Sequence, residues 1–365
     1  MKISYRDLNS GFLFAFVLLS GTLSLFYGLR LIELIIPFLA IILIAINKNI
    51  IPFGGITKLT ILFSFLVLTF GFFQFSYNSL FAIRLVNSVF ACGIMFYFSS
   101  SLKHFKLMPE YFLIIASVFY ILGIYAYFWE YMYIFSVLLA PLFFLKKYLF
   151  GFIDIIMLML IGQRTAILNI LFIIYFSFLS NIKLNILRTA PIFLIIILGL
   201  YAFFNLDSRA INVYRDLDFS EILAAISAAI ELASYYSYDE FVHGEGRAVL
   251  VEGGDLSLHL RFRKWGHALA SSDLYSIFFG LGPGYFGKAA DSGVIRLFFE
   301  YGLFVFITFT WLILKILKNS NALQRLIIGI FIISNIFLDV LYSPMLMGFT
   351  GMILGLSRSI NEDKN

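Results

Sequence analysis

The chain has 365 residues, of which 61% are hydrophobic, 19% aromatic and 13% charged, and its formal net charge is +5. Soluble globular domains are close to half apolar and about a quarter charged, so the composition excludes an ordinary soluble domain. A membrane-spanning helix needs about 20 residues. We therefore predict an all-α polytopic membrane protein with about 12 transmembrane helices, one sizeable loop and short connectors.

Apolar runs that could span a membrane follow one another along the whole chain. They cover residues 11–27, 31–47, 59–77, 79–99, 110–129, 131–145, 149–162, 165–181, 189–205, 291–313, 322–340 and 343–357. The short runs at 131–145 and 149–162 leave a tilted or re-entrant geometry open. Residues 1–205 are thus expected to hold nine spans, 206–290 the long loop, and 291–365 three spans and a tail.

Basic residues predict the orientation of these spans. With a cytoplasmic N-terminus, the short outer loops carry only Arg30 and Arg164. The inner segments carry fifteen Lys and Arg: Lys2, Arg6, Lys48, Lys58, Lys103, Lys106, Lys146, Lys147, Lys183, Arg188, Lys315, Lys318, Arg325, Arg358 and Lys364. Because short cytoplasmic loops are rich in Lys and Arg, both termini are predicted to be cytoplasmic and the long loop to be outside. The net charge of +5 is thus attributed to orientation rather than to nucleic-acid binding.

The long loop has local patterns of its own. Asp218 and Ser220 can cap an amphipathic helix that runs through EILAAISAAIELA. Residues 256–263 alternate with period two, yet Arg261 and Trp265 are one helical turn apart, so strand and helix both stay open there. The sequence GLGPGYFG predicts a glycine-rich turn, with its glycines as candidate hinges.

Ionisable residues concentrate near the outer ends of the predicted spans, where burial is costly unless the groups are paired or face water. These are Glu33, Arg84, Arg164, Asp291, Arg296, Glu300 and Asp339, whereas Asp154 lies deeper. If the helices pack around a common centre, these groups line a polar chamber. A purely structural role stays open for three of these residues. Arg296 and Glu300 could neutralise each other at i,i+4, and Asp291 could cap a helix.

Several chemistries have no motif in the chain. Cys92 is the single cysteine, which excludes a disulfide framework and a thiolate cluster. The four histidines include no pair at metal-ligand spacing, so no metal and no cofactor are expected. No phosphate-binding glycine loop precedes a helix, and the first apolar run lacks the cleavage pattern of a signal peptide.

Three short motifs resemble those of the O-antigen polymerase and ligase superfamily, and more specifically its Wzy-type polymerases. They are GQRTAIL at 162–168, RFRKW followed by FFGLGPGYF, and DSGVIRLFFEYGLF at 291–304. The order of spans around one late outer loop is also similar. Ligases of the superfamily have a catalytic histidine where this chain has Asp291, and that departure favours a polymerase.

The resemblance implies a GT-C-like membrane glycosyltransferase of the bacterial inner membrane with a periplasmic loop. Its substrates would be two oligosaccharide repeat units linked to undecaprenyl diphosphate, and a chain-length regulator stays open as a partner. Arginine suits a diphosphate because its planar fork binds phosphate oxygens bidentately. The implied phosphate ligands are Arg164 and Arg261, supported by Arg84, Arg296 and Arg263.

The remaining roles follow from the same resemblance. Asp291 is the expected general base and Glu300 its reserve, while Trp265 and Tyr285 would contact sugars or simply pack. The alternatives are an O-antigen ligase and a flippase for lipid-linked oligosaccharides. The sequence leaves open the sugars, the linkage, its stereochemistry and the oligomeric state.

Overall fold

The computed structural model describes residues 14–17, 19, 31, 35, 55–73, 80–101, 107–122, 128–161, 164–179, 227, 256–287 and 292–358. Within these residues every regular element is a helix, which confirms the all-helical class. The elements are α3 (Gly55–Phe73), α4 (Leu80–Ser101), α5 (Pro109–Ile121), α6 (Phe128–Phe144), α7 (Tyr148–Ile161), α8 (Arg164–Leu179), α13 (Leu256–Ala270), α14 (Leu274–Phe279), α15 (Gly293–Lys318), α16 (Ala322–Phe337), the 3-10 helix η3 (Val340–Tyr342) and α17 (Pro344–Leu356).

The predicted spans between residues 59 and 181, and those after residue 290, each overlap a described helix, although the run at 110–129 is matched only by α5, which ends at Ile121. The runs at 11–27, 31–47 and 189–205, and the amphipathic helix expected after Ser220, lie almost wholly outside the described residues. Two described helices, Phe81–Ser100 and Gly293–Lys318, are long and apolar enough to cross a membrane by length and composition. Shorter apolar helices accompany them: Lys58–Gly71, Pro109–Ile121, Glu130–Phe144, Tyr148–Met159, Ala322–Phe337 and Pro344–Leu356.

Helix starts follow local capping chemistry. Asn321 and Gln324 form a capping box at the start of α16, with bonds of 2.8 and 3.0 Å. Ser343 caps α17 and is followed by a proline, which suits the first helical position because it lacks a donor that would be unpaired there. Ser292 caps α15, accepting a bond from the Ile295 amide at 3.3 Å. The helix cap that the sequence suggested at Asp291 is thus Ser292.

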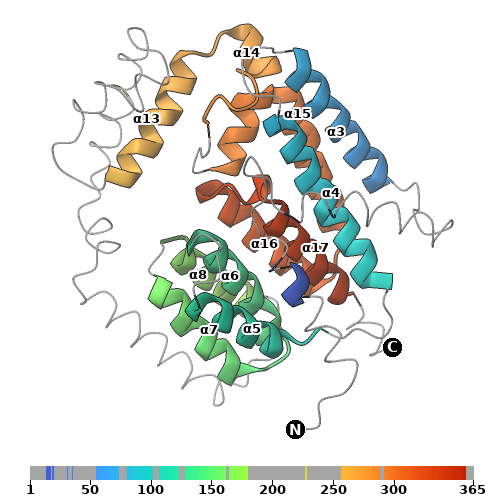
Figure 1. Ribbon diagram of the computed structural model, residues 1–365, viewed down its shortest axis with the longest axis vertical. Coiled ribbons are helices and arrows are strands. Elements are labelled where there is room, and N and C mark those ends of the chain that lie inside the picture. Colours follow the sequence, from blue (N-terminus) through green and yellow to red (C-terminus); the bar gives the residue numbers. More distant parts are fainter. Residues whose placement is uncertain are drawn as a thin grey trace.

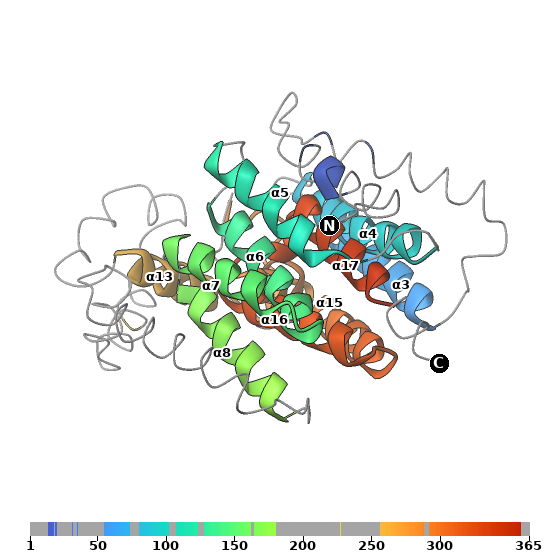
Figure 2. The same ribbon diagram turned by 90° about the horizontal axis from the view of Figure 1, so that it is seen from below.

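The helices form two groups joined by α16. Helices α5–α8 gather on one side, and α3, α4, α15 and α17 on the other (Figures 1 and 2). The closest pair is α4 with α17, because Gly351 and Gly355 are one turn apart and face the backbone of α4 at Cys92 and Phe96. Small residues at such spacing let two helix backbones approach closely.

Helix α15 changes direction in its first half, which the hydropathy pattern did not predict. Gly302 has φ 77° and ψ −178°, a non-helical conformation that splits the helix. A Cβ at Gly302 would collide with the carbonyl of Phe278, and a Cβ at Gly280 with that of Glu300. The two chain segments therefore cross through paired glycines, which brings the glycine-rich turn directly against α15.

Helix α13 resolves the open choice at residues 256–263 in favour of a helix. It lies at the edge of the group of described helices in both ribbon views (Figures 1 and 2). Its C-terminal part contacts the glycine-rich turn through a small apolar cluster that contains Ala268, Tyr285 and Phe286. Asp273 then caps α14, and the hydrogen bonds from Ser276 lower the pKa of its carboxyl below the ordinary value.

Candidate functional site

The outer charged cluster consists of Arg296, Glu300 and Asp339. The guanidinium of Arg296 donates from Nε to Glu300 Oε1 at 3.0 Å and from Nη1 to Asp339 Oδ2 at 3.5 Å. It also lies over the rings of Tyr342 and Phe81, at 4.2 and 4.9 Å from the centroids. Arg296 is 1% exposed and Glu300 is fully buried. The structure thus brings together three charges that the sequence assigned to the outer ends of two spans.

Hydrogen bonds hold the glycine-rich turn against α15, and Arg296 and Glu300 take part in several of them. Leu281 and Gly282 donate backbone hydrogen bonds to the carbonyls of Phe299 and Glu300, at 2.6 and 3.1 Å. The Phe286 amide donates to Glu300 Oε1 at 3.3 Å, and Arg296 Nη2 donates to the Gly287 carbonyl at 2.9 Å. These bonds stabilise the end of the first part of α15. Gly280 permits the close approach to α15, and the proposed hinge role of the other glycines in the turn stays a prediction.

Several polar atoms of this region have no hydrogen-bond partner among the described residues. They are Glu300 Oε2, Tyr301 Oη and Tyr342 Oη, and all are buried. Buried polar atoms are usually hydrogen-bonded, so a bound group with donors would satisfy these oxygens.

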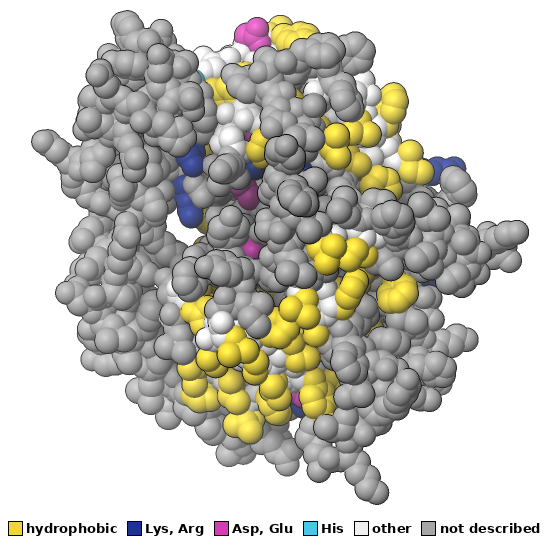
Figure 3. All heavy atoms as spheres, viewed as in Figure 1, with side chains coloured by type: hydrophobic (Ala, Val, Ile, Leu, Met, Phe, Trp, Pro, Cys, Tyr) yellow, Lys and Arg dark blue, Asp and Glu magenta, His cyan; other side chains and the backbone are white. Residues whose placement is uncertain are grey.

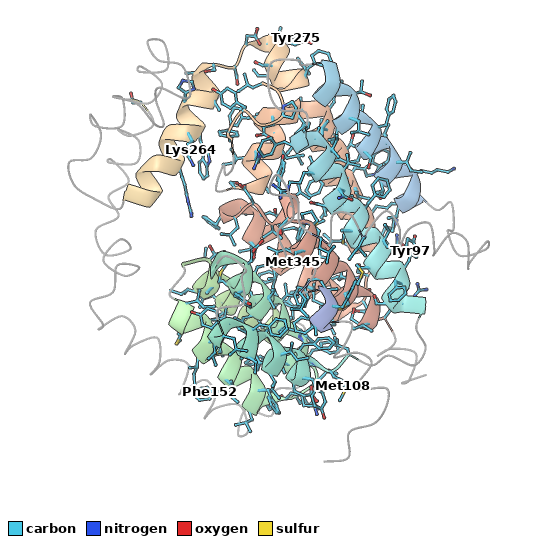
Figure 4. All side chains as sticks on the ribbon, viewed as in Figure 1. Tyr97, Met108, Phe152, Lys264, Tyr275 and Met345 are labelled. Atoms are coloured by element: carbon cyan, nitrogen blue, oxygen red, sulfur yellow. The ribbon has the colours of Figure 1, made fainter. Side chains whose placement is uncertain are left out.

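Arg261 lies on α13, apart from this cluster. Its Nε atom is buried and has no hydrogen-bond partner among the described residues. Figure 3 shows Lys and Arg side chains on α13 along one side of a hollow, with acidic side chains across from them. Lys264 lies on the stretch of α13 that borders this hollow (Figure 4). The described basic side chains of α13 therefore flank an open, charged space.

Tyr285 and Trp265, the predicted sugar contacts, both belong to the junction between α13 and the turn. Tyr285 is 5% exposed, and its hydroxyl lies 2.7 Å from His267 Nδ1 and donates to Ser271 Oγ at 3.2 Å. Trp265 is half-buried against the apolar cluster of Ala268 and Phe286. In this structure the tyrosine ring packs in the apolar cluster, and its contact with sugars stays a prediction.

The other predicted site residues are placed only partly. Arg84 is half-buried in the second turn of α4, and its carbonyl accepts a bond from Ser88 at 2.9 Å. Arg164 begins α8 and Arg263 lies within α13, but their side chains lie outside the described residues. Asp291, the predicted base, also lies outside them. Sequence reasoning did not single out the roles of Phe81, Tyr342 and the Gly287 carbonyl, because these contacts depend on long-range packing.

Comparison of the chain with protein-family models, curated proteins and solved structures gives no match. Among the described residues no group of three or more His, Cys, Asp or Glu side chains is arranged to hold a metal ion.

Proposed function

We propose that the chain is a polytopic protein of the bacterial inner membrane. The support is an inverted distribution of polarity. Phe304, Ile307, Trp311 and Leu314 form one face of α15 and are 45 to 58% exposed, while Arg296 and Glu300 on the same helix are buried. Large apolar side chains on the outside and charges on the inside suit a lipid environment, because apolar side chains exposed to lipid carry no hydration penalty.

Within this membrane protein, we propose an O-antigen polymerase of the Wzy type, acting at the periplasmic face. The observation that carries the proposal is Arg261, whose buried Nε has no hydrogen-bond partner among the described residues and which lies on the helix that borders a charged hollow. A guanidinium with an unused Nε donor beside such a space suits a phosphate group, which arginine binds through its planar fork. The sequence motifs around Arg261 and Glu300 support the same assignment.

The proposed reaction transfers a growing glycan between two lipid carriers. The bond between the anomeric carbon of the donor and its diphosphate oxygen breaks, and a bond forms to a hydroxyl oxygen of the acceptor repeat unit. The hydroxyl proton passes to a carboxylate, Asp291 or in reserve Glu300. Arg261, with Arg164, Arg84 and Arg263, stabilises the charge on the departing undecaprenyl diphosphate.

In this scheme Arg296 has a different role from the other arginines. Its Nε, Nη1 and Nη2 atoms already donate to Glu300, Asp339 and the Gly287 carbonyl. We assign it to holding Glu300 and the turn in place, and we assign the diphosphate to the other arginines, with Arg261 foremost among them. We therefore expect replacement of Arg261 to remove activity at normal protein level, and replacement of Arg296 to lower the stability of the fold.

The test uses the natural host with its own copy deleted and a plasmid copy restored. Arg261→Ala should abolish the ladder of lipopolysaccharide lengths at normal protein level, and Arg261→Lys should restore little of it, because lysine lacks the bidentate fork. Arg325→Ala is the matched control, since Arg325 is an exposed arginine at the start of α16. A full ladder in Arg261→Ala would contradict the assignment.

The two alternatives give different products in the same strain. Loss of a polymerase leaves a single repeat unit on the lipid A core, whereas loss of a ligase leaves bare core and lipid-linked polymer. Loss of a flippase leaves repeat units on the cytoplasmic side. The buried, fastened Arg296 and Glu300 beside the turn favour a fixed site, whereas a transporter is expected to have repeated halves around interrupted spans.

A further inference from the structure

Helix α14 exposes apolar side chains and buries its serine. Leu274 is 73% exposed, Tyr275 60% and Ile277 38%, whereas Ser276 is 8% exposed. A helix that faces water has the opposite arrangement, with its apolar side chains toward the protein and its polar ones outside. The Ser276 hydroxyl donates to the Asp273 carboxylate at 2.7 Å, so its burial is compensated. Helix α14 therefore has the polarity of an element that faces lipid.

The exposed surface of α14 continues into the apolar face of α15. The ring of Phe304, which is 45% exposed on α15, lies 5.6 Å from that of Phe278 and 5.8 Å from that of Phe279, measured between centroids. Phe279 in turn lies 4.8 Å from Tyr275 and 5.4 Å from Phe70 of α3. Figure 3 shows hydrophobic side chains at the surface over α14 and α3. These rings join α14, α15 and α3 into one apolar surface.

The chain from α14 through the glycine-rich turn is suited to a shallow position in a bilayer. Residues 274–287 include no Asp, Glu, Lys or Arg. The amides of Gly280, Leu281 and Gly282 donate to backbone carbonyls at 2.7, 2.6 and 3.1 Å. Non-helical backbone at membrane depth needs such partners, because lipid supplies none. Asp273, which precedes the uncharged run and caps α14, is exposed and suits the water side.

We propose that α14 is an interfacial helix whose exposed face lies among the lipids of the outer leaflet, where headgroups meet acyl chains. Leu274 and Ile277, three residues apart, face the acyl chains, while Tyr275 lies among the headgroups, the depth at which tyrosine is enriched. The sequence assigned all of residues 206–290 to a loop outside the membrane, and this proposal places one segment of that loop in the bilayer surface. It rests on the proposed membrane location but not on the polymerase activity.

An interfacial α14 would also fix the depth of the outer charged cluster. Gly280 directly follows α14, and a Cβ there would collide with the Glu300 carbonyl, so the two segments are in contact. Glu300 is bonded to Arg296 at 3.0 Å. The cluster therefore lies close to the level of the lipid headgroups, which is also the level of the diphosphate of a lipid-linked substrate.

The test is electron paramagnetic resonance of spin labels on the full-length protein in proteoliposomes, in a Cys92→Ala background. Leu274→Cys and Ile277→Cys carry the label on α14. Ile307→Cys, on the exposed face of α15, is the reference for lipid, and Arg325→Cys, exposed at the start of α16, is the reference for water. Power saturation measures how often each label collides with oxygen, which is enriched in lipid, and with a neutral nickel chelate, which is enriched in water.

Both α14 labels should have a ratio of oxygen to nickel collisions several-fold above that of Arg325→Cys and below that of Ile307→Cys, as a shallow position in lipid requires. A ratio equal to that of Arg325→Cys, with Ile307→Cys in lipid, would overturn the inference and leave the membrane location standing. Few collisions with either reagent would also overturn it, because another protein or a second copy of the chain would then cover this surface. A water-like Ile307→Cys would contradict the membrane location itself, and the inference with it.

Discussion

At the scale of single residues, Arg296 is the most heavily connected charge that the structure describes. It bonds to two carboxylates and one carbonyl, and it lies between two aromatic rings. Removing one partner of a buried ion pair leaves an uncompensated charge and costs about 3–5 kcal/mol. We therefore expect Arg296→Ala to lower the thermal unfolding midpoint in detergent substantially, with Arg325→Ala close to the unchanged protein.

A second replacement separates charge loss from packing loss at this residue. In Arg296→Ala the carboxylate of Glu300 is left without its guanidinium, so adding Glu300→Gln should recover part of the lost stability. The double-mutant cycle on unfolding midpoints measures this coupling. If the loss in the double variant equals the sum of the losses in the two single variants, the ion pair is not the stabilising contact.

The sequence predicted this pair but not its surroundings. The i,i+4 spacing of Arg296 and Glu300 is sufficient to predict their contact. The third charge, Asp339, was predicted only to lie at a similar depth, because its approach depends on how α16 and η3 pack on α15. Contacts with Phe81 and the Gly287 carbonyl come from still more distant segments, for which a single sequence carries no signal.

At the scale of elements, the contact of α4 with α17 depends on two glycines. A Cβ at Gly351 would collide with the backbone at Cys92. Overpacking of this kind costs about 1–3 kcal/mol. Gly351→Ala should therefore lower the unfolding midpoint, whereas Gly93→Ala on α4, where a Cβ meets nothing within 4 Å, should leave it unchanged or raise it. Equal effects of the two variants would contradict this packing.

The kink in α15 gives a second prediction at this scale. The conformation of Gly302 is almost confined to glycine, and a side chain there would cost about 1–3 kcal/mol. We expect Gly302→Ala to destabilise the junction of α14 with α15, seen as faster proteolysis in the turn at 280–287. Gly93→Ala is the control, because Gly93 lies in α4 outside this crossing and a Cβ there meets nothing within 4 Å. Similar proteolysis rates in both variants would show that the crossing is not tight.

Helix positions could be predicted, but the kink and the arrangement of α13 could not. Apolar runs locate helices because a helix in lipid must be continuously apolar. The run at 291–313 passes through Gly302 without any change in hydropathy, so the break is visible only in the crossing with Gly280. Residues 256–263 satisfied both periodicities, and only the full length of α13 decides between them.

At the scale of the whole molecule, the predicted orientation puts α14 outside and the start of α16 inside. Tyr275 is 60% exposed on α14 and Arg325 is exposed on α16. In a Cys92→Ala background, a membrane-impermeant maleimide should label Tyr275→Cys in spheroplasts and Arg325→Cys only after lysis. Labelling of Arg325→Cys in intact spheroplasts would contradict the orientation that the basic residues predict.

We propose that lipid-linked oligosaccharides are joined in the charged hollow beside α13. The most direct measurement is to incubate the purified full-length protein in proteoliposomes with repeat units linked to undecaprenyl diphosphate, and to analyse the products by mass spectrometry. We expect lipid-linked glycans of two and more repeat units, release of one undecaprenyl diphosphate for each new glycosidic bond, and loss of both in Arg261→Ala. Repeat units that remain single, with normal folding and substrate access, would contradict it.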